Sequence, residues 1–240
     1  MRLAVVGSSH IGPLREAAET IAARIRGLEV RFFGLPGGMF RQCRMDGGVF
    51  VSRPRTPAEA RTVRKINGAD RIDLDEADLI WAVGYRFGYG AVLQGWIDGK
   101  EPEAKMRAEV ATSVDHIVAQ FGAEPRLVLS PAPYPALRTR AAGPHHEARM
   151  AKIQRHPERD AIFAAFEETI TRMVGTAGYG IVLQPTHTRG SAFATDNDYL
   201  RGARDFETRE RTEDLRHMNG AYGLALFEAF AAKYLADAPG

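Results

Sequence analysis

Five short runs of apolar residues recur along the chain, and segments of helical periodicity separate most of them. The runs are near-continuous rather than alternating, which is typical of strands that are covered on both faces of a sheet. They lie at residues 3–6, 30–33, 79–83, 127–129 and 181–183. The sequence therefore predicts a central parallel sheet of about five strands.

Amphipathic segments between these runs predict helices at residues 14–25, 106–121, 160–174 and 218–235. In the third segment, Ile162, Phe166 and Ile170 recur at every fourth position and belong to an apolar stripe on one helical face. Alternation of strands and helices predicts an α/β fold in which helices cover both faces of the sheet.

Three irregular regions interrupt the alternation, at residues 34–76, 131–157 and 185–216. The first contains a possible short hairpin around residues 47–51. Each region follows a predicted strand, so we expect all three to gather at the carboxyl edge of the sheet, where ligands bind in open α/β folds. The chain shows no internal repeat and no linker, and we expect one domain over residues 1–240.

The composition fits a soluble globular protein, with 45% hydrophobic and 26% charged residues. The 32 basic and 30 acidic residues nearly balance, and the arginines are scattered rather than clustered, which argues against a nucleic-acid partner. A single cysteine, Cys43, excludes a disulfide framework and multi-cysteine zinc sites. No apolar run reaches the roughly 18 residues of a membrane span, and the apolar start is shorter than a secretory segment. We therefore expect no membrane partner and a cytoplasmic location.

The first candidate for chemistry is the sequence Gly7-Ser8-Ser9-His10, where a strand ends before a helix. Such a turn exposes a serine at the sheet edge and directs helix-start N–H groups toward a bound negative charge. A tight turn with a helix cap would explain the same residues. The segment lacks the lysine of a P-loop and the glycine spacing of a Rossmann fingerprint, so both nucleotide-binding motifs are excluded.

The second candidate is Asp214-Leu215-Arg216-His217, just ahead of the last predicted helix. The spacing lets the Asp214 carboxylate reach the His217 imidazole, fix its tautomer and stabilise its protonated form. A surface turn in which Asp214 caps the helix is the structural alternative.

Together, the two segments resemble the SGNH (GDSL-type) hydrolase superfamily, whose first block is Gly-Asp-Ser and whose last block is Asp-x-x-His. A histidine directly after the serine, as in Ser9-His10, looks like the variant in carbohydrate O-acyl esterases and acyltransferases. The resemblance implies a flavodoxin-like three-layer α/β/α sandwich and an ester-hydrolysing or acyl-transferring enzyme. It also implies Ser9 as nucleophile, His217 as general base and Asp214 as the residue that orients the imidazole.

The oxyanion site departs from the pattern of this superfamily, which uses a glycine after the second strand and an asparagine in Gly-x-Asn-Asp after the third. Here Gly84 matches, but Arg86 stands where the asparagine is expected. Either Arg86 is a charged donor or the site has one donor fewer. The other glycine could be Gly34, Gly37 or Gly38, of which we favour Gly38.

Several other residues fall in the loops that follow strands. His187 could contact substrate or hydrogen-bond within its loop. Arg53, Arg86 and Arg189 could hold an anionic group, because a guanidinium binds such groups bidentately, or they could be solvated surface residues. The adjacent residues His145 and His146 point apart on a chain, so we expect no metal site there.

The sequence predicts a serine ester hydrolase that needs no cofactor or metal. Its expected substrate is a carbohydrate or small-molecule ester from which it removes a short acyl group such as acetyl. An O-acyltransferase with the same triad is one alternative. The other is a non-catalytic binding domain with a degraded oxyanion site, which Arg86 would favour.

Overall fold

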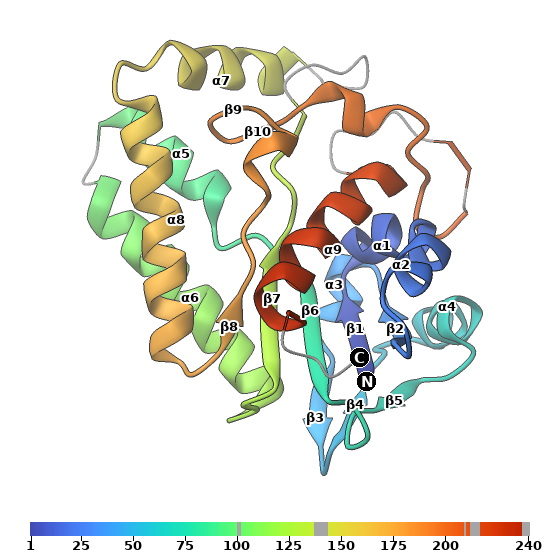
Figure 1. Cartoon of the computed structure of the whole chain (residues 1–240). Coiled ribbons are helices and arrows are strands. Elements are labelled where there is room, and N and C mark those ends of the chain that lie inside the picture. Colours follow the sequence, from blue (N-terminus) through green and yellow to red (C-terminus); the bar gives the residue numbers. More distant parts are fainter. Residues whose placement is uncertain (100–101, 137–143, 209, 212–216, 237–240) are drawn as a thin grey trace.

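A computed structural model describes residues 1–99, 102–136, 144–208, 210–211 and 217–236. Its centre is a five-stranded parallel sheet with the strand order β2-β1-β6-β7-β8 (Figure 1). These strands are β1 (Arg2–Gly7), β2 (Glu29–Gly34), β6 (Leu79–Tyr85), β7 (Leu127–Pro131) and β8 (Gly180–Ile181). Each of the five apolar runs therefore overlaps one strand of this sheet, and the predicted parallel sheet is confirmed. Counted in chain order, the five strands have the 2-1-3-4-5 arrangement of flavodoxin-like folds.

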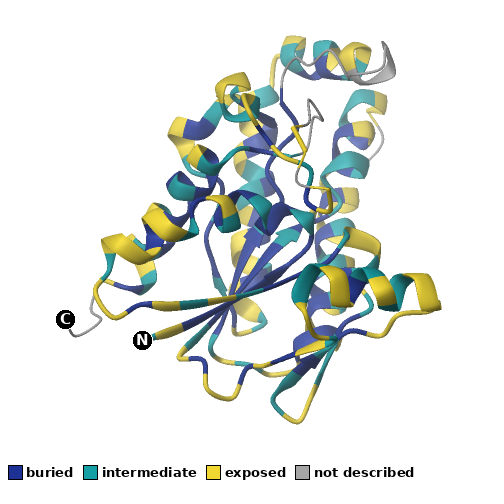
Figure 2. Ribbon diagram, turned by 90° about the vertical axis from the view of Figure 1, so that its right-hand side faces the viewer, coloured by how far each residue is buried: buried dark blue, intermediate teal, exposed yellow. Residues whose placement is uncertain are grey.

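Helices cover both faces of this sheet and make a three-layer α/β/α sandwich, as predicted (Figures 1 and 2). Leu3 and Val5 face one layer, and Ala4 and Val6 face the other, because side chains alternate along a strand. The first layer contains α1 (Gly12–Glu16), α2 (Ala18–Arg24) and α9 (Gly220–Tyr234). The second contains α5 (Tyr89–Asp98), α6 (Pro102–Phe121) and α8 (Arg159–Thr176).

Three of the four predicted helices correspond to α6, α8 and α9. The segment 14–25 was expected as one helix, but it forms α1 and α2, with Ala17 between them outside helical geometry. Helix α9 begins at the cap residue Asn219, whose side chain accepts a hydrogen bond from the Tyr222 N–H. On the buried side of α9, Phe230 stacks on Trp81 with ring centres 4.2 Å apart, and the Trp81 indole donates to Ser130 Oγ at 2.9 Å.

The segment after β2 contains more regular structure than the sequence predicted. It forms α3 (Gly37–Phe40), β3 (Arg44–Asp46), β4 (Val49–Val51), α4 (Pro57–Asn67) and β5 (Arg71–Asp73). The expected hairpin is confirmed as β3 and β4, and β5 extends it to a three-stranded antiparallel sheet. Phe50 anchors this small sheet to the core, where it stacks on Phe121 at 4.9 Å between ring centres.

The three irregular regions do not all lie at the carboxyl edge. Figure 1 shows the β3–β4 hairpin at the opposite end, near the start of β1, while α7 (Pro144–Arg155) lies beyond the carboxyl ends of the parallel strands. The expectation that residues 131–157 are irregular was wrong for α7. Short elements occupy the third region, namely η2 (Thr186–Thr188), β9 (Arg189–Ser191), β10 (Ala194–Thr195) and η3 (Asn197–Leu200).

A partly buried ion pair fastens the β9–β10 ribbon to α8. Arg189 donates to Glu167 at 2.9 Å, and its guanidinium lies 4.9 Å from the centre of the Phe163 ring. Tyr134 donates its hydroxyl to the same carboxylate at 3.3 Å. Burial raises the pKa of Glu167 above its usual range, although the Arg189 charge opposes this shift. Arg189 is therefore a structural residue, and neither a solvated surface residue nor an anion site.

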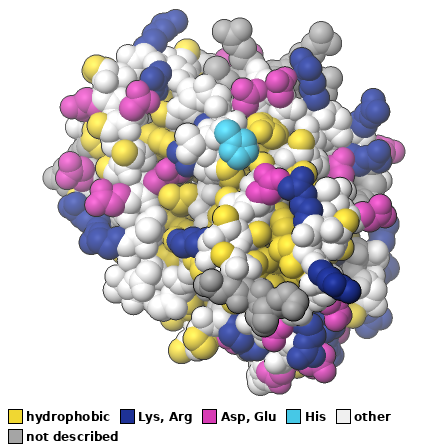
Figure 3. All heavy atoms as spheres, viewed as in Figure 1, with side chains coloured by type: hydrophobic (Ala, Val, Ile, Leu, Met, Phe, Trp, Pro, Cys, Tyr) yellow, Lys and Arg dark blue, Asp and Glu magenta, His cyan; other side chains and the backbone are white. Residues whose placement is uncertain are grey.

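Charged side chains of both signs are interspersed over the face seen in Figure 3. None of the helices in the described ranges has the length and apolar character that crossing a membrane requires.

Candidate active site

The turn that carries Ser9 packs tightly against strand β6. The turn consists of Ser8 and the 3-10 helix η1 (Ser9–Ile11), directly after Gly7. The Ser8 N–H donates to the Val83 carbonyl at 3.0 Å. A Cβ on Gly7 would lie 2.4 Å from that carbonyl oxygen and 2.5 Å from Ile11 Cγ2, so only glycine fits. This close approach fixes where Ser9 leaves the sheet.

A cavity of about 240 Å³ lies in front of this turn. Its lining comes from three neighbouring segments at the carboxyl edge, which follow β1, β2 and β6. Ser9, Gly38, Gly84 and Arg86 all line it, so the fold brings together four of the predicted site residues from distant parts of the sequence. The same cavity is lined by His10, a buried residue that the sequence prediction did not include in the site.

Gly84 must be glycine because of both its backbone angle and its surroundings. Its φ is +107°, and a Cβ there would lie 2.0 Å from Ser8 Oγ. Ser8 Oγ in turn donates to the Gly84 carbonyl at 3.4 Å. The glycine that the sequence marked as an oxyanion candidate therefore also allows the serine turn and the end of β6 to come into contact.

Gly38 is exposed in the first turn of α3, and its Cβ position is open space. Within the described part of the chain, neither the Gly38 nor the Ser9 N–H donates a hydrogen bond. Two residues that line the cavity thus have backbone N–H groups without a hydrogen bond to the described chain, and an oxyanion site requires donors of this kind. Arg86 is exposed, and it lines the same cavity.

Two side-chain amides, from the buried Gln120 and the half-buried Asn67, hold the segment that carries Gly38. The Tyr85 hydroxyl donates to Gln120 Oε1 at 2.6 Å, and Gln120 Nε2 donates to the Phe40 carbonyl at 2.7 Å. Asn67 accepts from the Gly34 N–H and donates to the Gly34 carbonyl, both at 2.9 Å. Both ends of the segment between Gly34 and Phe40 are therefore fixed by side chains from α6 and α4.

His217 reaches this region from the other end of the chain. Its ring centre lies 5.9 Å from that of His10, which is the residue next to Ser9. Asp214, its predicted partner, lies outside the residues that the structure describes. A described carboxylate, Asp205, interacts electrostatically with His217. The pKa of Asp205 is lowered, chiefly by a hydrogen bond from the Thr208 N–H, and the charge of His217 contributes to the shift.

Some predicted residues lie elsewhere. His187 is exposed in η2 and is not among the described residues that line the Ser9 cavity. The side chains of His145 and His146 are outside the described part. Among the described residues, no group of three or more metal-ligating side chains comes together. Cys43 is buried, and burial raises the pKa of its thiol to about 12.

No protein-family model matches this sequence, and no curated protein does. Among solved structures, an extracellular lipase from Streptomyces rimosus is 12% identical, with a TM-score of 0.41, over 95% of this chain and 99% of the lipase. A DUF4886 family protein from Bacteroides uniformis is 13% identical, with a TM-score of 0.45, over 100% of this chain and 86% of that protein. These likenesses concern the chain trace and assign no activity to this protein.

Proposed function

We propose that this protein is a serine ester hydrolase of the SGNH type, with Ser9 Oγ as the nucleophile. The proposal rests on one observation above all. A single cavity collects Ser9, Gly38, Gly84 and Arg86, and the His217 ring lies beside the neighbouring residue His10. A serine nucleophile needs a base to take its proton and donors to stabilise the oxyanion, and this arrangement has candidates for both roles.

In the proposed reaction, His217 takes the proton of Ser9 as Oγ attacks the acyl carbon. The N–H groups of Ser9 and Gly38 stabilise the oxyanion of the tetrahedral intermediate, and Arg86 adds a charged donor. The alcohol leaves with the proton held by His217, and the acyl group stays on Ser9. Water then attacks the acyl-enzyme while His217 again takes and returns a proton. Asp214 orients the imidazole, as its spacing from His217 suggests.

The size of the cavity supports a short acyl group. A space of about 240 Å³ accommodates acetyl together with the reacting atoms of an ester. The substrate would be an ester of a carbohydrate or another small molecule in the cytoplasm. If a sugar hydroxyl replaces water in the second half, the same residues make an O-acyltransferase.

Labelling with a fluorophosphonate tests the nucleophile directly, because the reagent phosphonylates an activated serine. We expect one adduct, on Ser9, and no adduct on Ser9→Ala. Ser113→Ala is the matched control, because Ser113 lies in α6 and donates to the Glu109 carbonyl. Equal hydrolysis of 4-nitrophenyl acetate by the wild type and Ser9→Ala would contradict the proposal. Absence of both labelling and hydrolysis would favour a non-catalytic binding domain, the alternative suggested by Arg86.

A further inference from the structure

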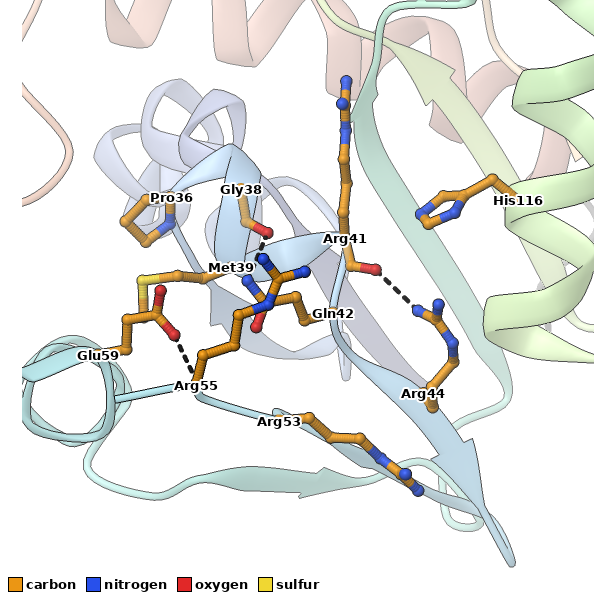
Figure 4. Close-up of a pocket in the computed structure, with 10 residues that line it drawn as sticks. All are labelled: Pro36, Gly38, Met39, Arg41, Gln42, Arg44, Arg53, Arg55, Glu59 and His116. Carbon is orange, nitrogen blue, oxygen red and sulfur yellow. Dashed lines mark hydrogen bonds between the residues drawn. The ribbon is translucent and has the colours of Figure 1, made fainter. Parts of the chain in front are cut away.

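A second, larger cavity of about 870 Å³ adjoins the candidate active site. Its lining comes from α3, from β3, from the loop between β4 and α4, from the start of α4 and from α6 (Figure 4). Gly38 and Arg41 line both cavities, so the two spaces meet at α3. We call the larger space the arginine groove, after four of its lining residues: Arg41, Arg44, Arg53 and Arg55.

The positive charge of the arginine groove is largely unneutralised. Arg44 donates to the carbonyls of Arg41 and Cys43, both at 2.7 Å. The guanidinium groups of Arg41, Arg53 and Arg55 make no hydrogen bond or ion pair with the part of the chain that the structure describes. This differs from other arginines of the molecule, such as Arg189, which pairs with Glu167.

One carboxylate, Glu59, lies among the lining residues, and it has a structural task. Its side chain accepts a hydrogen bond from the Arg55 backbone N–H at 2.6 Å (Figure 4). Thr56 Oγ1 accepts a hydrogen bond from the Glu59 N–H. Thr56 is the cap residue of α4, and Glu59 binds the backbone N–H of the residue before the cap, which makes the arrangement a variant of the capping box. Glu59 is thus held at the helix end, and it is the one acidic residue among the described lining residues, which include four arginines.

His116 lies within the positive field of the arginine groove. It lines the groove from α6, and its Nε2 is buried without a hydrogen-bond partner in the described part of the chain. Its pKa is lowered, first by burial and then by the charges of Arg44 and Arg41. Like charges disfavour the protonated imidazole, so the groove favours an anion.

We propose that the arginine groove binds an anionic group on the alcohol portion of the ester while Ser9 attacks the acyl carbon. This inference rests on the proposed function and narrows its substrate class to esters that carry a phosphate, sulfate or carboxylate. The smaller cavity at Ser9 takes the acyl group, and the larger groove has room for the alcohol. Guanidinium groups suit this task because they bind oxyanions bidentately and stay charged at every physiological pH.

A matched pair of esters tests the selectivity. The acidic ester is 2-(4-acetoxyphenyl)ethyl phosphate, and its neutral counterpart is 2-(4-acetoxyphenyl)ethanol. We expect the wild type to favour the phosphate by at least about ten-fold in kcat/KM, and Arg53→Gln/Arg55→Gln to remove most of that ratio. The control Arg61→Gln/Arg172→Gln removes the same charge from exposed positions outside the groove and should keep the ratio. An equal change in both double variants, or no preference in the wild type, would overturn the proposal.

A binding measurement separates this proposal from the proposed function, because it needs no turnover. Inorganic phosphate is titrated into Ser9→Ala while NMR follows the His116 imidazole. We expect saturable binding that raises the His116 pKa, and about ten-fold weaker binding when Arg53→Gln/Arg55→Gln is added. Phosphate binding without esterase activity in the wild type would support the arginine groove as an anion site and would reject the proposed hydrolase function. Esterase activity with no phosphate binding and no preference between the two esters would reject the groove alone.

Discussion

The ring of His217 lies with its centre 5.9 Å from the ring of His10, although the two residues come from opposite ends of the chain. His10 lines the candidate active site next to Ser9. The last helix α9 packs on α1, directly after the serine turn, and this packing brings the two ends together. The separation between Ser9 and His217, the proposed nucleophile and base, is therefore set by the packing of two helices, and we expect any substitution that shifts α9 to lower the proposed activity.

The carboxylate that orients His217 can be identified by two matched substitutions. We expect Asp214→Asn to keep the fold and lower kcat by about 10²- to 10⁴-fold, because asparagine can hold the imidazole in the wrong tautomer. Asp205→Asn should cost less, because the Asp205 side chain already accepts hydrogen bonds from the N–H groups of Glu207 and Thr208. Circular dichroism and steady-state kinetics on 4-nitrophenyl acetate provide the measurements. A larger loss in Asp205→Asn would assign the orienting role to Asp205.

Arg86 should act on the transition state. If it stabilises the oxyanion, Arg86→Ala should lower kcat and kcat/KM together, by on the order of 10²-fold, for neutral and acidic esters alike. Exposed Arg172 on α8 provides the control substitution, Arg172→Ala. A rise in KM at constant kcat, restricted to acidic esters, would instead show that Arg86 binds the charged group of the substrate.

Gly84→Ala should damage both the stability and the activity of the protein. The new Cβ would lie 2.0 Å from Ser8 Oγ at a φ of +107°, so the serine turn must move. We expect a loss of about 1–3 kcal/mol in the free energy of unfolding, measured with urea, and a large fall in kcat. Gly175→Ala in α8 meets open space and should stabilise the protein by about 0.5–1 kcal/mol. Unchanged kinetics in Gly84→Ala would show that the turn is not tightly constrained.

The partly buried carboxyl of Glu167 should make stability depend on pH. Its folded-state pKa is raised by burial, so its contribution is fully present below the unfolded-state pKa and is lost as pH rises through the folded-state pKa. Glu167→Gln keeps the acceptor for Arg189 and Tyr134 but does not titrate. We expect the wild type to lose stability relative to Glu167→Gln as the pH rises from about 4 to 7. Urea titrations across this range, with Glu168→Gln at the exposed neighbouring position as control, measure the difference. A gain with rising pH would contradict the burial argument.

The sequence predicted the central sheet because its strands are buried on both faces, so residues such as Val5 and Trp81 stand in short apolar runs. It missed α4, although Thr56 and Glu59 have the spacing of a capping box. It also missed α5 and α7, because their neighbouring glycines and prolines suggested loops. The helices that the sequence predicted, α6, α8 and α9, have 15 to 20 residues, whereas α4, α5 and α7 have only 10 to 12 and show fewer repeats of an apolar stripe.

The sequence predicted the residues of the candidate active site that follow strands, and it did not predict the contacts that depend on packing between distant elements. Ser9, Gly38, Gly84 and Arg86 could be found because each follows a predicted strand, and parallel strands bring such positions to one edge. Of the arginine groove, this reasoning singled out Arg53 alone. Its arginines show no periodicity in the sequence, and they meet only because α3, the β3–β4 hairpin and the start of α4 fold against α6. The Arg189–Glu167 pair likewise depends on packing between distant elements.

Helix α6 contacts both cavities, because it lines one of them and supports the short helix α3 that lines the other. His116 lines the arginine groove, and Gln120, one turn further along α6, holds the Phe40 carbonyl at the end of α3. Phe40 and Gly38 belong to the same short helix, so a rotation of α6 about its axis would change the shape of the groove and the position of the Gly38 N–H at once. The proposed ligand selectivity and the proposed catalytic geometry therefore share one rigid support, so a substitution in α6 that alters one should also alter the other.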